Sequence, residues 1–403
     1  MESRVVSHAV REGVTVSPVR TTTAVTLCTV VAVMPVFFVG ASGVFLREDL
    51  RFDETGLGMA VAVFMASSAV FAVAGGRLPE RIGAGNALMV VGIGSGMAML
   101  GVAVLADTLT HLVLLLALGG ACNSVALPAG NLALARGVVG RPALVFGVRQ
   151  AAIPVATLLA GASVPLVSLT LGWRWAFALG AILSVGAATF VPRQLAPAHA
   201  RRGTRVREGD AATGPLVAMA VAFGVATAAA VSLGTFLVEA AVATGVAAST
   251  AGWLLVAGSV AGIGARLFVG WLADRYGGWA LYMVTVMLVL GAGGYGMLAL
   301  GGPVFLTIGT LVAYGCAWGW VGLLMFAIVR LNPNAPAAAT GIVLAGAASG
   351  AALGPLAFGY VAATASFQAA WSLAAIAALV AAGLVFAARA WLLRDRARRG
   401  TAG

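Results

Sequence analysis

Residues 76–83 read Gly-Arg-Leu-Pro-Glu-Arg-Ile-Gly, and residues 270–277 read Gly-Trp-Leu-Ala-Asp-Arg-Tyr-Gly. Both stretches fit the pattern G-x-L-x-[DE]-R-x-G, and 194 residues separate them (270 − 76). The same offset relates three further pairs of residues: Gly58 and Gly252, Arg136 and Arg330, and Gly147 and Gly341. Landmarks that share one register indicate an ancestral unit that occurs twice in the chain.

The composition indicates that lipid surrounds both copies of this unit. Of the 403 residues, 61% are apolar and only 9% are charged, and the mean hydropathy is +1.03. A soluble domain carries about 25% charged residues, so this chain cannot cover a water-facing surface of its size. The net charge of +11 comes from 24 arginines and no lysine, a bias typical of a GC-rich genome. These arginines gather at the ends of apolar runs and form no basic face, which excludes a nucleic-acid partner.

Apolar runs of about 20 residues, the length needed to cross a bilayer, predict an all-α polytopic membrane protein with twelve transmembrane helices. The predicted order is a tail (1–23), a six-helix half (24–192), a linker (193–214), a second six-helix half (215–388) and a basic tail (389–403). The predicted spans are 24–46, 58–75, 87–106, 112–135, 144–166, 176–191, 215–240, 251–272, 280–300, 304–329, 338–362 and 370–388.

The distribution of arginine predicts the orientation of these spans. With both termini in the cytoplasm, twenty arginines fall in cytoplasmic segments, including Arg266 and Arg275, and only Arg47, Arg51 and Arg174 fall outside. Cytoplasmic loops carry an excess of basic residues. The chain is therefore expected to lie in the bacterial cytoplasmic membrane with both ends inside.

No pattern for catalysis or for a cofactor accompanies the spans. The three cysteines lie singly in apolar runs and the three histidines are scattered, which supports neither a disulfide framework nor a metal site. No Ser/His/Asp or Cys/His cluster and no nucleotide-binding glycine loop occurs. We therefore expect no enzyme activity, no cofactor and no ATP-driven transport within this chain.

The two repeated motifs, with the stretch Gly-Trp-Arg-Trp-Ala-Phe at 172–177, resemble the major facilitator superfamily over residues 24–388. The first motif departs from the usual pattern at Pro79 and Glu80 but keeps the carboxylate. The resemblance implies a secondary transporter whose two halves rock about a central site. It also implies a conformational latch of charged residues and glycines near the helix ends, unless these residues serve only the positive-inside rule. The latch candidates are Gly76, Glu80, Arg81, Gly83, Gly270, Asp274, Arg275, Gly277, Arg136 and Arg330.

Arg149 is the main candidate for a substrate contact. It lies about 12 Å into the predicted fifth span, at 1.5 Å per residue, where a charge is costly unless it faces a cavity or a partner. Arg149 could bind the negative group of a substrate, or its side chain could extend to the cytoplasmic surface. The other substrate-binding candidates are Gln150, Asn123, Asn131 and Trp320. For the asparagines and the tryptophan, packing between helices is an open alternative.

Glu239 is the candidate for proton coupling, because it is the carboxylate within a predicted span. Its position near the outer end of helix seven also fits a solvated carboxylate at the membrane surface.

We expect the protein to be a monomer that transports a small organic solute, and an anion is favoured. The alternative is a drug or secondary-metabolite exporter, but Leu116 stands where such exporters carry an arginine, and no Gly-Pro-x-x-Gly-Gly run surrounds Pro154.

Overall fold

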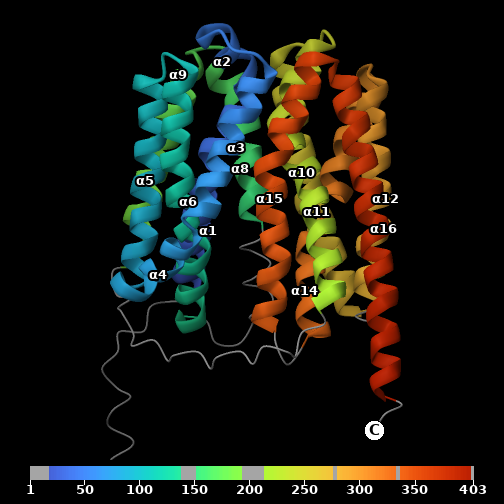
Figure 1. Cartoon of the computed structure of the whole chain (residues 1–403). Helices are drawn as coiled ribbons and strands as arrows, with labels where there is room; N and C mark the ends of the chain where they lie inside the picture. Colours follow the sequence, from blue (N-terminus) through green and yellow to red (C-terminus); the bar gives the residue numbers. More distant parts are fainter. Residues whose placement is uncertain (1–17, 138–150, 193–212, 276–278, 333–335, 401–403) are drawn as a thin grey trace, which may run out of the picture.

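A computed structural model describes residues 18–137, 151–192, 213–275, 279–332 and 336–400. The fold is entirely helical in this part of the chain (Figure 1). The elements up to residue 190 are α1 (Pro18–Ala41), α2 (Gly43–Leu50), α3 (Glu54–Val70), α4 (Ala72–Ile82), α5 (Ala84–Leu105), α6 (Leu109–Gly137), α8 (Ala152–Ser163), the π-helical turn η1 (Val164–Ser168) and α9 (Trp173–Phe190). The elements from residue 213 onward are α10 (Thr213–Ala243), α11 (Ala248–Arg275), α12 (Ala280–Leu300), α13 (Pro303–Val312), the π-helical turn η3 (Ala313–Ala317), α14 (Val321–Leu331), α15 (Pro336–Thr364) and α16 (Phe367–Gly400).

Ten helices in the described ranges are long and apolar enough to cross a membrane, or eleven if the bent pair α3 and α4 forms one span. The sequence predicted twelve. The difference arises at the predicted span 144–166, because its first part lies outside the described residues. The described part, Ala152–Ser168, is a shorter apolar helix. The all-helical membrane class is confirmed, and the count of twelve stays a prediction.

Two predicted boundaries are corrected by helix breaks toward opposite ends of the molecule (Figure 1). The predicted first span, 24–46, is divided at Ser42 into α1 and the short helix α2. The first repeated motif was expected in a loop, but most of it is the last part of α4, which is bent by 53° relative to α3. This helix ends at Gly83, whose φ of 88° is a backbone conformation that glycine adopts without a steric cost.

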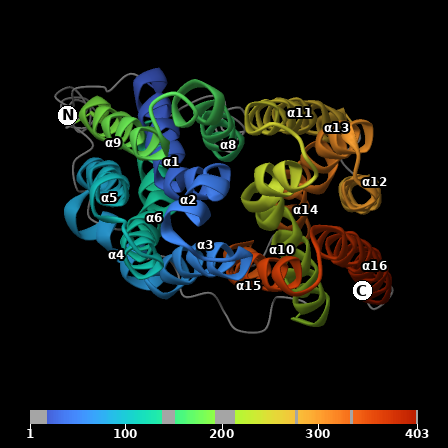
Figure 2. The same ribbon diagram turned by 90° about the horizontal axis from the view of Figure 1, so that it is seen from above.

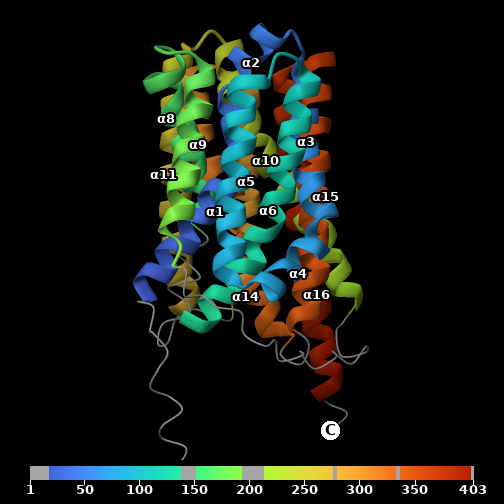
Figure 3. The same ribbon diagram turned by 90° about the vertical axis from the view of Figure 1, so that its left-hand side faces the viewer.

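The helices form two groups that stand side by side (Figures 1 and 2). We call α1–α9 the N-half and α10–α16 the C-half. The end that carries α2 is called the outer end, following the predicted orientation, and the opposite end, where α16 finishes, is called the inner end (Figure 3). The halves meet along α1 with α10, α3 with α15 and α8 with α11. The last two pairs are neighbours in the view from above (Figure 2).

Backbone contacts without intervening side chains bring these helix pairs together. A Cβ atom at Gly252 of α11 would lie 2.8 Å from the carbonyl oxygen of Gly161 in α8. A Cβ atom at Gly58 of α3 would overlap the carbonyl group of Pro355 in α15. Gly58 and Gly252 are 194 residues apart, and so are Gly161 and Pro355. These two glycine contacts therefore occur at equivalent positions of the sequence repeat, and both require glycine for close approach.

Candidate functional site

An ion cluster joins the two halves at the outer end. Arg47 in α2 of the N-half pairs through Nη1 with Oε1 of Glu239 in α10 of the C-half. The same nitrogen lies 2.8 Å from Oε1 of Glu54 at the start of α3. The helical end at Glu54 is fixed by Asp53, whose Oδ1 accepts a hydrogen bond of 2.9 Å from the amide nitrogen of Gly56. We call Arg47, Glu54 and Glu239 the outer ion cluster.

Burial makes the outer ion cluster electrostatically important. The Glu239 side chain is only 3% exposed, whereas Arg47 is 25% exposed. Burial alone would lower the pKa of the Arg47 guanidinium, but its hydrogen bond to Glu239 and the nearby negative charges more than offset this, so that its pKa is raised. Arg47 therefore stays charged. A cavity of about 360 Å³ lies beside the cluster, and Oε2 of Glu239 has no hydrogen-bond partner in the described residues.

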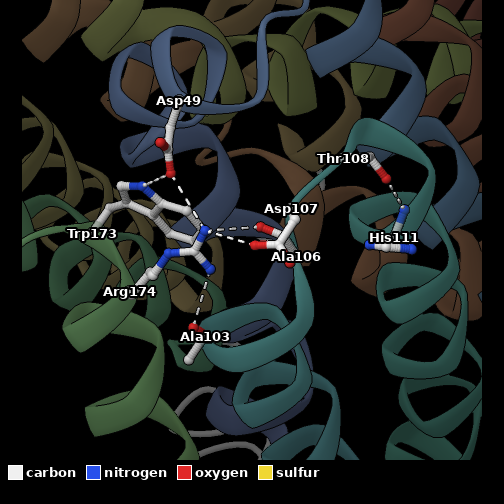
Figure 4. Close-up of polar contacts among 8 residues, drawn as sticks. All are labelled: Asp49, Ala103, Ala106, Asp107, Thr108, His111, Trp173 and Arg174. Carbon is white, nitrogen blue, oxygen red and sulfur yellow. Dashed lines mark hydrogen bonds and ion pairs between the residues drawn. The ribbon is translucent and has the colours of Figure 1, made fainter.

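A second polar cluster at the outer end stays within the N-half (Figure 4). Arg174 of α9 donates through Nη2 to Asp107 at 3.1 Å and to the carbonyl oxygen of Ala106 at 3.2 Å. The indole nitrogen of Trp173 donates to Asp49 of α2 at 3.2 Å. These bonds tie α2, α9 and the turn between α5 and α6 to one another, so the N-half holds α2 firmly behind the outer ion cluster.

Closer to the middle of the helices, polar and aromatic side chains also join the halves. The hydroxyl groups of Thr157 in α8 and Ser259 in α11 form a buried hydrogen bond of 2.8 Å. The rings of Phe37 in α1 and Trp318 have centroids 5.7 Å apart, and both side chains are buried. Tyr314 packs on the other side of Trp318, with a centroid distance of 5.6 Å. This aromatic group fills the interface between α1 and the broken helix α13–η3–α14.

Arg266 lies on the inner side of these contacts. The sequence analysis placed Arg266 with the cytoplasmic arginines. However, α11 continues to Arg275, nine residues beyond Arg266. Arg266 therefore lies within the candidate span Ala248–Ala273. Its Nη2 donates a hydrogen bond of 3.0 Å to the carbonyl oxygen of Trp318. No carboxylate in the described part of the chain pairs with it.

The predicted latch residues do not form ion pairs with one another in the described ranges. Glu80 and Arg81 are exposed on α4, and Arg275 is exposed at the end of α11. Nothing lies within 4 Å of a Cβ atom built at Gly76 or Gly270, so close packing does not require glycine at either position. Arg330 is exposed and lies over the ring of Phe326, 5.3 Å from its centroid. The side chains of Arg136 and Asp274, and all of Gly277, lie outside the description.

The predicted substrate residues lie at separate places in the fold. Asn123 donates from Nδ2 to the Ser68 hydroxyl at 3.0 Å, which joins α6 to α3 within the N-half. Trp320 is buried in the C-half core, where its indole nitrogen donates to the Ala317 carbonyl oxygen at 2.7 Å and its ring packs against Phe223. Asn131 is exposed on α6. The two remaining predicted residues, Arg149 and Gln150, lie outside the described residues.

Sequence reasoning missed the partner of Glu239 and the embedded position of Arg266. Arg47 was counted as an outer-loop charge, and 192 residues separate it from Glu239. The available signal for Arg266 was its place within the predicted span 251–272, four residues before the repeated motif. No group of histidine, cysteine and carboxylate side chains in the described ranges could hold a metal ion.

These features define a class of protein, a multi-pass helical carrier with two halves joined across their interface. The family model of the Major Facilitator Superfamily matches residues 25–335. The chain therefore belongs to the major facilitator superfamily, whose members are membrane transporters. No curated protein sequence matches it.

Solved structures of two transporters share the fold. A mutant of the nucleoside transporter NupG aligns with a TM-score of 0.72 and 16% identity, covering 93% of this chain and 99% of that one. A bacterial homologue of the human lysosomal transporter Spinster, in an inward-facing and occupied conformation, aligns with a TM-score of 0.75 and 14% identity, covering 93% and 97%. At this identity the likeness establishes the fold alone.

Proposed function

We propose that this protein is a secondary transporter of a small organic anion that works by alternating access between its N-half and C-half. The observation that carries the proposal is the buried pair between Arg47 and Glu239, because it joins the halves and also uses the carboxylate that lies deepest in the spans. Membership of the family supports transport in general, and the anionic class of the substrate goes beyond it.

The arrangement of contacts supports an outer-closed state. Gly58 lies near the outer end of α3, Gly252 near the outer end of α11 and Glu239 near the outer end of α10. A rotation of the halves about an axis at the depth of the Thr157–Ser259 hydrogen bond would separate all three contacts together.

The distribution of charge favours an anion over a cation. A cationic drug in the middle of the membrane would need an unpaired carboxylate, and the described spans carry none near their centres, because Glu239 is paired near the outer end. Arg266 lies in a span, and no carboxylate in the described residues pairs with it. Arg149 is also predicted to lie in a span. An anionic substrate can therefore be neutralised by the protein, and a cationic one cannot.

Glu239 is the proposed proton carrier. When the outer end opens, α10 moves away from α2 and the Glu239 carboxylate loses Arg47. Loss of the neighbouring cation removes an interaction that favours the ionised form, so the carboxylate takes up a proton more readily. Outer opening would then be coupled to protonation from the outside, as proton-driven uptake in a bacterial plasma membrane requires.

The test is uptake into proteoliposomes, without ATP, of benzoate, glucose and tetraphenylphosphonium, with and without an imposed pH gradient. We expect the gradient to drive accumulation of benzoate beyond that in protein-free liposomes, and we expect this excess to be lost in Glu239→Gln. Arg20→Gln, which removes an exposed charge on α1, is the control. Transport of tetraphenylphosphonium alone would refute the anionic class and favour the drug-exporter alternative.

A further inference from the structure

The Arg266 guanidinium is a charged group within the membrane span whose role the ion pairs of this structure leave unexplained. Arginine has five N–H donors. One bond, from Nη2 to the Trp318 carbonyl oxygen, is the hydrogen bond that this side chain makes in the described part of the chain. A charged side chain inside a span is costly unless it has a partner or faces a cavity. A helix carbonyl alone does not neutralise its charge.

Glycine at residue 262 lets the guanidinium lie close to α11. Gly262 is buried one turn before Arg266, and a Cβ atom there would lie 3.2 Å from the carbonyl oxygen of Tyr314 and 3.7 Å from Nη1 of Arg266. Arg266 keeps an intermediate exposure, although it lies within the span. In the described ranges, the N–H groups that do not reach Trp318 bond no other protein acceptor.

The undescribed segment before α8 contains no carboxylate. Residues 138–150 lead into α8, which packs against α11. Their sequence is Val-Val-Gly-Arg-Pro-Ala-Leu-Val-Phe-Gly-Val-Arg-Gln and contains no aspartate or glutamate. The counter-charge for Arg266 must then come from a more distant segment or from a ligand.

The bond to Trp318 positions the guanidinium at the interface between the halves. Trp318 follows the π-helical turn η3, where the helix is interrupted before α14 begins at Val321. Its ring contacts Phe37 of the N-half. Broken helices of this kind commonly border transport sites, because they expose backbone groups near the middle of the membrane. Arg266 is thus joined by a backbone hydrogen bond to the residue whose ring contacts the N-half.

We infer that Arg266 binds the carboxylate of a singly charged organic acid, with its Nη2 held by the Trp318 carbonyl and its remaining N–H groups directed to the ligand. The planar guanidinium matches a carboxylate in two parallel hydrogen bonds. A single cation neutralises one negative charge, which favours a monocarboxylate over a phosphate. The Trp318 and Tyr314 rings are packed in the interface, so the assignment concerns the charged group of the ligand and not its body. This inference rests on the proposed anionic function and names the residue and the ligand class.

The test compares benzoate with benzamide, its neutral analogue, on the purified full chain in detergent. Dissociation constants and thermal midpoints are measured for the wild type, Arg266→Gln, Arg266→Lys and the control Arg20→Gln. The glutamine variant is informative because its amide can still donate to the Trp318 carbonyl while carrying no charge.

We expect benzoate, but not benzamide or phosphate, to stabilise the wild type and the control equally. Arg266→Gln should raise the dissociation constant for benzoate about thirtyfold or more, with little change in the midpoint without ligand. Arg266→Lys should give a smaller increase, since it keeps the charge and loses the planar fork. Unchanged affinity in Arg266→Gln would overturn the inference and leave the proposed function standing if the wild type still transports benzoate. A wild type that neither binds nor transports any carboxylate would overturn both.

A second measurement covers the case in which Arg266→Gln does not fold. Binding of 4-nitrobenzoate next to Arg266 should quench the fluorescence of Trp318, whereas Trp318→Phe keeps the backbone carbonyl and removes the indole. We expect the saturable quenching of the wild type to fall sharply in Trp318→Phe. Identical saturable quenching in both proteins would place the carboxylate elsewhere and refute the assignment.

Discussion

Removal of Arg47 should open the outer end. In Arg47→Ala the buried Glu239 carboxylate loses its cation and remains close to Glu54. Breaking a buried ion pair by removing one partner costs about 3–5 kcal/mol. Since 25% of the Arg47 side chain is exposed, solvent screening reduces this figure, and we expect about 2 kcal/mol against the outer-closed state. That energy corresponds to about a thirtyfold change in the equilibrium between outer-closed and outer-open forms.

The assay is a distance distribution between spin labels on Thr110 and Thr250, which are exposed at the outer ends of the N-half and the C-half. The labels require a background in which the free cysteines Cys28, Cys122 and Cys316 are replaced. We expect one short distance in the wild type and a large longer component in Arg47→Ala. The double variant Arg47→Ala with Glu239→Gln should regain much of the short distance, because the amide leaves no unpaired charge behind.

Arg174→Ala is the matched control for this prediction. It removes the same charge from the same end of the molecule, but its partners Asp49 and Asp107 belong to the N-half like Arg174 itself (Figure 4). Its distance distribution should stay that of the wild type. Arg174→Ala and Arg47→Ala could open the outer end equally. The total charge at the outer end, and not the Arg47–Glu239 pair, would then set the equilibrium between the outer-closed and outer-open forms, and the reasoning would fail.

Three further predictions concern the interface, the undescribed segment and the C-half core. Gly58→Leu should lengthen the same spin-label distance and reduce uptake at least tenfold, because its side chain would overlap the Pro355 backbone, whereas Gly186→Leu, with open space around its Cβ, should not. Arg149→Ala should weaken benzoate binding in a thermal-shift assay if Arg149 contacts the substrate, and an unchanged shift would remove it from the site. Trp320→Phe should lower unfolding free energy by about 1 kcal/mol through loss of its bond to Ala317 and leave the apparent KM unchanged; a raised KM would return Trp320 to the substrate path.

Much of the architecture could be predicted from residue types alone. In lipid, a backbone must satisfy its hydrogen bonds within a helix, so the apolar runs predict helices whatever their neighbours are. The repeat at 194 residues also predicted which positions correspond, and Gly58 with Gly252 occupy equivalent contacts between the halves. The family followed from the motifs at 76–83 and 270–277, and the match over residues 25–335 confirms it.

Only the tertiary structure decided which side chains meet. A membrane helix is apolar on all sides, so periodicity does not distinguish the face toward lipid from the face toward another helix. Arg47 and Glu239 meet although 192 residues separate them, and no local pattern links them. Arg266 differs from the surface arginines only because α11 continues past it and the interruption at η3 presents the Trp318 carbonyl beside it. Residue types determined the solvent, the helices and the repeat, whereas the packing of the two halves determined which of the described charges are paired.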